Sequence, residues 1–212
     1  MSLFHGKKKW VPRAIQSMFT HIKKRWYVKQ AVQNCVRTGS PIKLVIGSGG
    51  TSHPGWISTD VQVLNVTNAS HWRRYFKPDS IDRVLAEHVL EHLTESQNRT
   101  ALALCYMYLK PGGIFRVAVP DGYRRDHDYV TEVMPPKDGH QILFTIDTLT
   151  AMLKAAGFKV NSLEYFDSSE KFHAADWDNE DGHVRRSVRY DRQTAFQRGE
   201  LYYTSLILDG IK

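Results

Sequence analysis

The stretch at residues 43–60, KLVIGSGGTSHPGWISTD, carries the strongest indication of the fold. Its first four residues form a short apolar, β-branched run, and glycines at positions 47, 49 and 50 follow at once. This pattern predicts a buried parallel strand that enters a tight turn. Glycine suits the turn because it adopts backbone angles that other residues avoid and lets a ligand approach the main chain closely.

A second short strand is predicted at 56–59, and Asp60 closes it. A carboxylate at the end of the second strand of a nucleotide-binding sheet can accept hydrogen bonds from ribose hydroxyls. The turn departs from the dinucleotide fingerprint G-x-G-x-x-G, because Pro54 and Gly55 leave little room for the helix that would follow it. A nucleoside ligand without phosphates therefore fits better than a nicotinamide or flavin cofactor, although a plain strand-to-helix turn has the same pattern.

Three further stretches follow in a set order. A predicted strand at 81–86 runs into EHVLEHL at 87–93, LKPGG at 109–113 precedes a strand at 114–119, and a helix ends at Gly157. In this order and spacing the stretches resemble the class I S-adenosylmethionine-dependent methyltransferases, most closely a small bacterial group with a GSG…GWIxxD opening. The resemblance covers about residues 41–158 and extends more weakly through a final strand at 202–209.

The resemblance implies a Rossmann-like, seven-stranded α/β sheet that is mostly parallel, with helices on both faces and an antiparallel last strand. No full helix fits between the first three strands, so this half of the sheet is expected to be abbreviated. Helices are expected at 70–76, capped by Ser70, at 95–109 and at 146–156. Strands are expected at 43–46, 56–59, 61–66, 81–86, 114–119, 159–165 and 202–209.

The resemblance also implies a cofactor, S-adenosyl-L-methionine, which leaves as S-adenosyl-L-homocysteine. Glu87 ends a core strand at the carboxyl edge of the sheet, where open α/β folds bind ligands. There it would neutralise the ammonium group of the cofactor, and residues 67–69 lie where the family contacts adenine. The implied cofactor-binding residues are Gly47, Ser48, Gly49, Gly50, Asp60, Val61, Asn68, Ala69, Glu87 and His88.

Candidate catalytic residues lie in a long polar loop at 120–141, which is expected to form the substrate side of the pocket. Methyl transfer needs mainly alignment of the acceptor, and it needs a base only for a hydroxyl or a protonated amine. His140 is the first candidate for that base because imidazole titrates near neutral pH. Asp121 and Tyr123 are candidates for positioning the acceptor, and a purely structural role stays open for all three.

The sequence His88-Val-Leu-Glu91-His92 matches the H-x-x-E-H pattern of inverted zinc peptidases, whose histidines share a metal on one helical face. Here the motif directly follows a strand end, and it lies downstream of a glycine turn and a ribose-type acid that a peptidase does not need. We therefore predict no metal site. His92 is expected to cap or pack at the start of the next helix, and His88 to contact cofactor or substrate or only to pack.

Positive charge is concentrated at the N-terminus. The chain has 212 residues and a net charge of +7, yet residues 1–59 contain no Asp or Glu. The first 39 residues hold nine Lys or Arg, whereas the other 173 carry 20 basic and 22 acidic side chains. Apolar residues spaced by three, four and seven between 13 and 37 predict one amphipathic helix or two. This arm is expected to pack on the sheet edge or over the cofactor site, or to contact anionic lipid or a partner protein, and a nucleic-acid groove is disfavoured.

The sequence divides into the basic arm at 1–39 and a methyltransferase domain at 40–212, within which a charged insertion, with a hairpin as one interpretation, occupies 167–200. No apolar run reaches 18 residues and no secretory signal pattern is present. We therefore expect a cytoplasmic protein, at most peripheral at the inner membrane face. Cys35 and Cys105 have no metal-type spacing and fit a reducing compartment.

The function expected from the resemblance is O-methylation of a sugar in a cell-surface glycan or its precursor, because the resembled group accompanies polysaccharide synthesis. Methylation of a small-molecule metabolite is the second expectation. Two alternatives come from other classes: a cofactor-binding or assembly module without turnover, and a nucleotide-dependent oxidoreductase.

Overall fold

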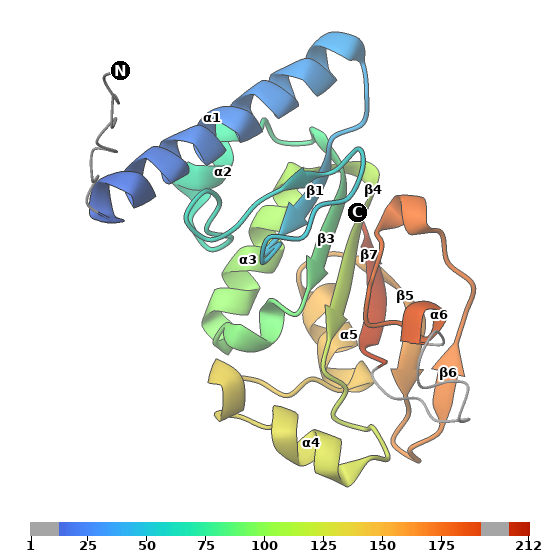
Figure 1. The fold of residues 1–212 in the computed structure, drawn as a ribbon. Helices are drawn as coiled ribbons and strands as arrows, with labels where there is room; N and C mark the ends of the chain where they lie inside the picture. Colours follow the sequence, from blue (N-terminus) through green and yellow to red (C-terminus); the bar gives the residue numbers. More distant parts are fainter. Residues whose placement is uncertain (1–12, 192–203) are drawn as a thin grey trace, which may run out of the picture.

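A computed structural model describes residues 13–191 and 204–212 of the chain, and it describes the side chains of 21–190 and 204–212. Its centre is one seven-stranded sheet in the order β2-β1-β3-β4-β7-β5-β6 (Figure 1). The strands are β1 (Lys43–Ile46), β2 (Ile57–Ser58), β3 (Ile81–Glu87), β4 (Leu109–Val119), β5 (Lys159–Phe166), β6 (Phe172–Ala174) and β7 (Leu206–Ile211).

The pairing of the strands confirms the predicted class of sheet. Strands β1, β2, β3 and β4 pair in parallel, and β7 runs antiparallel between β4 and β5. The last strand is therefore reversed, as expected, and the short strand β6 is reversed as well. The carboxyl ends of β3 and β4 point toward α4 at the lower edge of the sheet in Figure 1.

The predicted third strand at 61–66 is wrong. The carbonyl of Asp60 accepts hydrogen bonds from the amides of Val63 and Leu64, at 2.8 and 2.9 Å, which folds the chain into a turn. Val63 and Leu64 are buried, so the apolar pattern reports burial in a turn rather than a strand. The seventh strand is instead β6, which pairs antiparallel with β5 inside the charged insertion.

The helices begin at recognisable caps. Thr94 and Thr145 form capping boxes at the starts of α3 (Glu95–Tyr108) and α5 (Ile146–Ala155). Asn68, not the predicted Ser70, caps α2 (Ala69–Tyr75), because its side-chain oxygen accepts the Ser70 amide. The other helices are α1 (Arg13–Thr38), η1 (Leu90–His92), α4 (His127–Val133), η2 (Lys137–Gly139), η3 (Asn179–Asp181) and α6 (Val188–Asp191).

One face of the sheet is covered by the long helices. Leu44 of β1, Val84 of β3 and Phe115 of β4 lie in one buried cluster with Trp72 of α2 and Leu102 of α3. The same cluster includes Val28 and Val32 of α1 and Leu149 and Leu153 of α5. Burial of this apolar surface is the main favourable term in folding.

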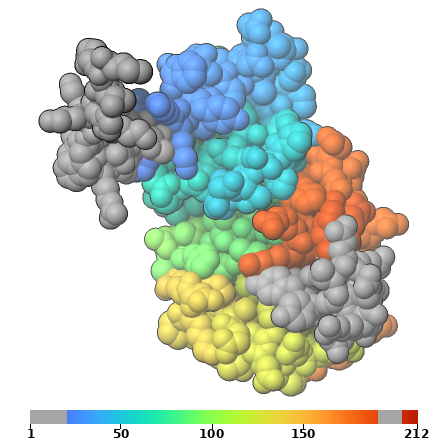
Figure 2. Space-filling view, viewed as in Figure 1, coloured from blue at the N-terminus to red at the C-terminus, as the bar shows by residue number. Residues whose placement is uncertain are grey.

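Among the described residues, the opposite face is covered by the irregular segment 175–191 and its short helices. Alternate strand residues, Val45, Leu85 and Ala118, point to this face and pack with Trp177 and Val184 of the segment. Figure 2 shows the orange segment lying against the cyan residues near the glycine turn. The predicted insertion therefore does the covering that a full helix between the first strands would otherwise do; its residues 192–200 lie outside the described part of the chain.

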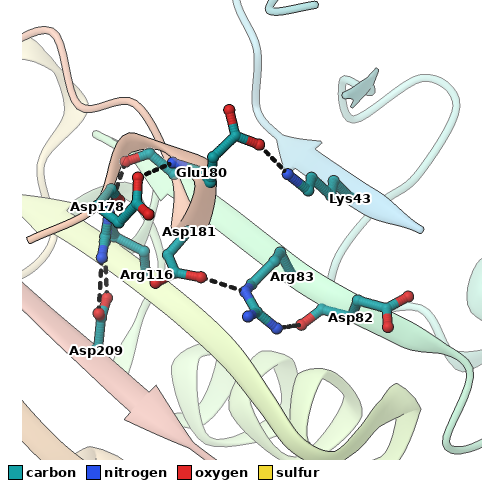
Figure 3. A network of polar contacts seen from close by, with 9 residues as sticks. Lys43, Asp82, Arg83, Arg116, Asp178, Glu180, Asp181 and Asp209 are labelled. Atoms are coloured by element: carbon teal, nitrogen blue, oxygen red, sulfur yellow. Dashed lines mark hydrogen bonds and ion pairs between the residues drawn. The ribbon is translucent and has the colours of Figure 1, made fainter. Parts of the chain in front are cut away.

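Arg116 on β4 anchors this segment to the sheet. Its side chain is 1% exposed and donates two hydrogen bonds of 2.8 Å to the Asp209 carboxylate. It also donates to the backbone carbonyl of Asp178 (Figure 3) and to that of Gly182, both at 2.7 Å. Its guanidinium lies 4.7 Å from the ring centre of Trp177. These hydrogen bonds therefore join β4 to β7 within the sheet, and they join β4 to the covering segment at residues 175–191.

Two further basic side chains, on the neighbouring strands β3 and β1, also contact this segment. Arg83 on β3 pairs with Asp181 at 2.5 Å, and Lys43 on β1 pairs with Glu180 at 2.6 Å (Figure 3). Glu180 is largely exposed, so its pair contributes little, whereas the Arg83 pair is partly buried. The acidic η3 turn thus crosses three adjacent strands and lies over a basic residue on each.

Helix α1 lies across the β2 edge of the sheet. Val28 and Val32 are buried there, and Lys24 approaches Asp60 at 3.4 Å. Ile22, Trp26 and other apolar side chains of α1 remain more than half exposed. None of the helices in the described ranges combines the length and the apolar content needed to cross a bilayer.

We predict that Asp209→Asn lowers the free energy of unfolding by about 3–5 kcal/mol, because it leaves the Arg116 guanidinium buried without a counter-charge. Urea denaturation followed by circular dichroism measures the change. The matched control is Glu95→Gln, which removes the exposed pair with Arg99 and should change stability by about 0.5 kcal/mol or less. Equal effects of the two variants would contradict the anchoring role.

Candidate functional site

A cavity of about 380 Å³ opens at the carboxyl ends of β1 and β3. Such a position is where open α/β sheets bind ligands, and the volume is within the range of small-molecule sites. One wall of the cavity is formed by the glycine turn and the end of β3, and the other wall is formed by the segment 175–191. The lining residues are Val45, Gly47, Ser48, Gly49, Thr51, His53, Leu85, Glu87, His88, Arg185 and Arg186.

The glycine turn is shaped by close approach and by left-handed backbone angles. Gly47 has φ +63°, and a Cβ there would lie 2.5 Å from Cγ2 of Val89, so no larger residue fits. Gly49 and Gly50 have φ +56° and +89°, and a Cβ added at either position would meet no atom within 4 Å. The main chain of the turn therefore stays bare toward the open side, where a ligand can reach it.

Asp60 closes the turn from the neighbouring strand. Its Oδ1 accepts hydrogen bonds from the amide of Gly49 at 2.9 Å and from the hydroxyl of Ser48 at 3.2 Å. Its Oδ2 faces Lys24 of α1 at 3.4 Å. Val61, the next residue, is 60% exposed. The predicted ribose-binding acid is thus beside the glycine turn, and an exposed apolar side chain adjoins it.

Glu87 and His88 form the end of β3 within the cavity. The Glu87 carboxylate accepts a hydrogen bond of 2.9 Å from the backbone amide of Arg186. His88 has φ +54°, which turns the chain out of the strand. Its Nε2 lies 3.0 Å from the Ser205 hydroxyl and its Nδ1 lies 2.8 Å from the Glu91 carboxylate. Each side chain therefore contacts a residue distant in sequence, Arg186 for Glu87 and Ser205 for His88.

The other predicted cofactor residues lie outside the cavity wall. Asn68 caps α2 and Ala69 begins that helix, and neither is among the lining residues. Gly50, Asp60 and Val61 adjoin the turn without belonging to the lining. Five of the predicted set, Gly47, Ser48, Gly49, Glu87 and His88, are brought together around the cavity.

The three candidate catalytic residues are placed elsewhere. Asp121 is fully buried and accepts hydrogen bonds from the amides of Tyr123 and Phe166, at 2.9 and 2.8 Å, so it ties β4 to β5. The Tyr123 hydroxyl lies 3.1 Å from the Asp147 carboxylate at the start of α5. His140 is 6% exposed and packs against His92, with ring centres 4.9 Å apart. No residue of 120–141 is among those lining the cavity.

Sequence reasoning missed four polar lining residues: Thr51, His53, Arg185 and Arg186. The first two lie in the stretch after the glycines, where the sequence indicated only the lack of a helix. The arginine pair lies in the insertion, and its position was hidden because only the folded chain brings it to the glycine turn. His53 and His183 lie 4.9 Å apart by ring centres, and burial together with the charge of His53 lowers the pKa of His183.

The residues present fit an adenosine-type cofactor with a charged amino-acid end. The bare glycine turn offers main-chain contact, Asp60 offers a carboxylate beside it, and Glu87 offers a second carboxylate at the strand end. A carboxylate suits ribose hydroxyls or an ammonium group because ionised acids are strong hydrogen-bond acceptors. Binding would require Lys24 to leave or share the outer oxygen of Asp60.

The comparison with protein families agrees with this geometry. Residues 55–117 match the family model described as a methyltransferase domain, which runs from just before β2 into β4. The matched part contains Asp60, Glu87 and His88. No match was found among curated proteins.

Solved structures similar to this chain include several methyltransferases. An S-adenosylmethionine-dependent methyltransferase from Archaeoglobus fulgidus is 17% identical over 89% of this chain and 94% of its own, with a TM-score of 0.48. A Thermotoga maritima protein, described as a possible histamine N-methyltransferase, is 15% identical over 94% and 97%, with a TM-score of 0.48. The 1,6-didemethyltoxoflavin-N1-methyltransferase of Burkholderia thailandensis, solved with S-adenosylhomocysteine, is 14% identical over 94% and 85%, with a TM-score of 0.45.

The methyltransferase-domain match over residues 55–117 and the reversed β7 support the class predicted from the sequence, the class I S-adenosylmethionine-dependent methyltransferases. S-adenosylmethionine is the cofactor of that class, as expected. The acceptor is a separate question, because function resides in the site rather than in the fold.

We predict that Asp60→Asn weakens binding of S-adenosylmethionine and S-adenosylhomocysteine at least tenfold, which is about 1.4 kcal/mol. The reason is loss of the charged acceptor beside the glycine turn. Isothermal titration calorimetry measures both affinities. Asp128→Asn, on the exposed surface of α4, is the control and should bind as the wild type does. Unchanged affinity in Asp60→Asn would remove Asp60 from the cofactor site.

Asp121 gives a prediction about pH. Burial raises the pKa of its carboxyl from 3.8 to about 6, although two amide donors and the charge of Arg124 act to lower it. Because the folded-state pKa lies above the unfolded one, the protonated form stabilises the fold below about pH 4. That contribution, about 3 kcal/mol, is lost as the pH rises through 6. Asp121→Asn should lack this loss, and urea denaturation at pH 4 and 7 tests the difference between the two proteins.

Proposed function

We propose that this protein transfers the methyl group of S-adenosylmethionine to a hydroxyl of a sugar, in a cell-surface glycan or its precursor. The observation that carries the methyl-transfer part is the cavity that joins the glycine turn to Glu87 and His88, within a matched methyltransferase domain. The sugar is the finer part of the proposal. It is supported by the chemistry of the lining and by the resemblance drawn from the sequence.

The lining of the cavity favours a polar acceptor. Only Val45 and Leu85 are apolar side chains among the lining residues, whereas Thr51, His53, Arg185 and others present donors and acceptors. Sugar hydroxyls can be oriented by several such groups at once. The two arginines also favour an acceptor that carries a phosphate or carboxylate, as activated and lipid-linked sugars do.

The protein's part in the reaction is alignment. The bound cofactor supplies a methyl group on a positively charged sulfur, and this group is transferred in line to the acceptor oxygen. The turn at 47–50 and Asp60 would fix the nucleoside end, and Glu87 would fix the amino-acid end. Holding the acceptor oxygen on the line of transfer accounts for much of the rate that an enzyme supplies.

A hydroxyl acceptor must also lose a proton. His53 and His88 line the cavity, whereas His140 does not. His88 is held between Ser205 and Glu91, a setting that orients an imidazole for proton transfer. The geometry therefore favours His53 or His88 over the predicted His140 as the group that receives the proton.

The basic arm is proposed to meet an anionic surface at the inner face of the membrane, where lipid-linked sugars are assembled. Trp26 and Tyr27 are 65% and 52% exposed on α1, and Lys23 and Lys29 lie on the same helix. Exposed aromatic and basic side chains together are typical of interfacial helices. A partner protein with an acidic surface is the alternative occupant.

The test is release of S-adenosylhomocysteine from S-adenosylmethionine in the presence of nucleotide-activated and lipid-diphosphate-linked sugars. We expect turnover with at least one sugar and a drop of at least tenfold in kcat for His88→Gln if His88 takes the proton. His173→Gln, an imidazole paired with Asp167 away from the cavity, serves as the control. Cofactor binding without turnover on any acceptor would favour a cofactor-binding or assembly module. Methylation of a non-sugar metabolite, with no turnover on sugars, would refute the proposal that the acceptor is a sugar.

A further inference from the structure

Glu91, His92 and His140 meet outside the cavity described above. Their oxygen and nitrogen ligand atoms all lie within 4.8 Å of one another. The segments that carry them are joined by the main chain, because the amides of Gln141 and Ile142 donate to the Glu91 carbonyl at 2.6 and 3.3 Å. The meeting of these side chains is therefore a product of the fold and not of chance proximity at the surface.

The Glu91 carboxylate is buried without adequate hydrogen bonding. The residue is 0% exposed, and its Oε2 has no hydrogen-bond partner among the described residues. Its Oε1 lies 2.8 Å from Nδ1 of His88, although without the alignment of a hydrogen bond. An ionised carboxylate in such a place carries a large desolvation penalty unless a positive charge compensates it. Oε2 of Glu91 is therefore available to bind a cation.

His140 is prepared to act as a ligand. Its Nδ1 lies 2.7 Å from the carbonyl oxygen of Val133, which can only accept, so Nδ1 carries the proton. In the neutral ring Nε2 then has a free lone pair. A ring N–H donated to a backbone carbonyl is the usual support of a metal-binding histidine, because it fixes the tautomer and the orientation.

His92 completes the group from the solvent side. It is exposed, and its ring lies 65° from the plane of the His140 ring at 4.9 Å between centres. Ligands around a tetrahedral zinc ion lie about 3.4 Å apart for bonds of about 2.1 Å. Closure therefore needs movements of about 1 Å, which an exposed side chain can make. Solvent would reach the remaining coordination positions.

His88 acts here as a support and not as a ligand. Its two ring nitrogens face Glu91 and Ser205. The positive φ of His88 and the 3₁₀ turn at Leu90–His92 also break the helical face on which an H-x-x-E-H peptidase motif would place both histidines. The set of ligands is thus different from the one that the sequence motif suggests, and it includes His140, which lies 48 positions after His92.

We propose that Glu91, His92 and His140 bind a divalent first-row transition-metal ion. Two imidazoles and one carboxylate are the donor set of catalytic zinc sites and of other transition-metal sites with open positions. Because His88 contacts Glu91 and also lines the cavity, the ion would lie next to the candidate cofactor site. It would also lock the turn at 88–92 to the segment at 133–142.

The test uses the full chain, purified without a histidine tag and treated with a chelator. We expect one equivalent of Zn²⁺ by calorimetry, a rise in Tm with added Zn²⁺, and a Co²⁺ ligand-field spectrum of low-symmetry coordination. His92→Ala should bind Zn²⁺ at least tenfold more weakly, and because His92 is exposed the variant should fold normally. Glu91→Gln should lose the Zn²⁺-dependent rise in Tm while matching or exceeding the Tm of the metal-free wild type.

His127→Ala is the matched control, since this imidazole is 78% exposed on α4 and should leave binding unchanged. No uptake of Zn²⁺ or Co²⁺ by the wild type would overturn the proposal. Equal affinity in the wild type and His92→Ala would overturn it as well, because the ion would then be held elsewhere. All of these readouts are independent of methyl transfer, so they stand apart from the test of the proposed function.

Discussion

The buried pair of Arg116 and Asp209 is the interaction on which the rest of the structure depends. It joins β4 to the reversed strand β7, and its remaining donors hold the carbonyls of Asp178 and Gly182. Burial raises the pKa of the Asp209 carboxyl even though Arg116 acts to lower it. Desolvation is thus the larger effect, and the pair contributes more to a unique arrangement of the covering segment than to net stability.

The covering segment also makes the candidate site. The chain has no room for a helix after its first strand, so one face of the sheet would lie bare without residues 175–191. The segment packs Trp177 and Val184 on the apolar strand residues, and then places Arg185 and Arg186 at the cavity. The Arg186 amide reaches the Glu87 carboxylate at 2.9 Å. Core packing and ligand binding are therefore linked through one stretch of main chain.

The turn that follows β3 connects two chemical environments. Glu87 and His88 face the cavity, whereas Glu91 and His92 face His140 at a separate cluster. The positive φ of His88 makes this division possible, because it redirects the chain within one residue. The position of Glu87 and His88 at the cavity and the position of Glu91 beside His140 consequently depend on the same short turn.

The sequence by itself determined where the parallel strands β1 to β5 lie along the chain, the glycine turn, Asp60 and the strand-end Glu87, because local patterns encode strands, turns and their polar ends. It could not show that 61–66 is a turn, since buried apolar residues give the same pattern in either case. Nor could it show that His140 joins Glu91, or that Arg185 lies at the glycine turn. Those contacts join residues 48 or more positions apart, and only tertiary packing on a particular face of the sheet decides them.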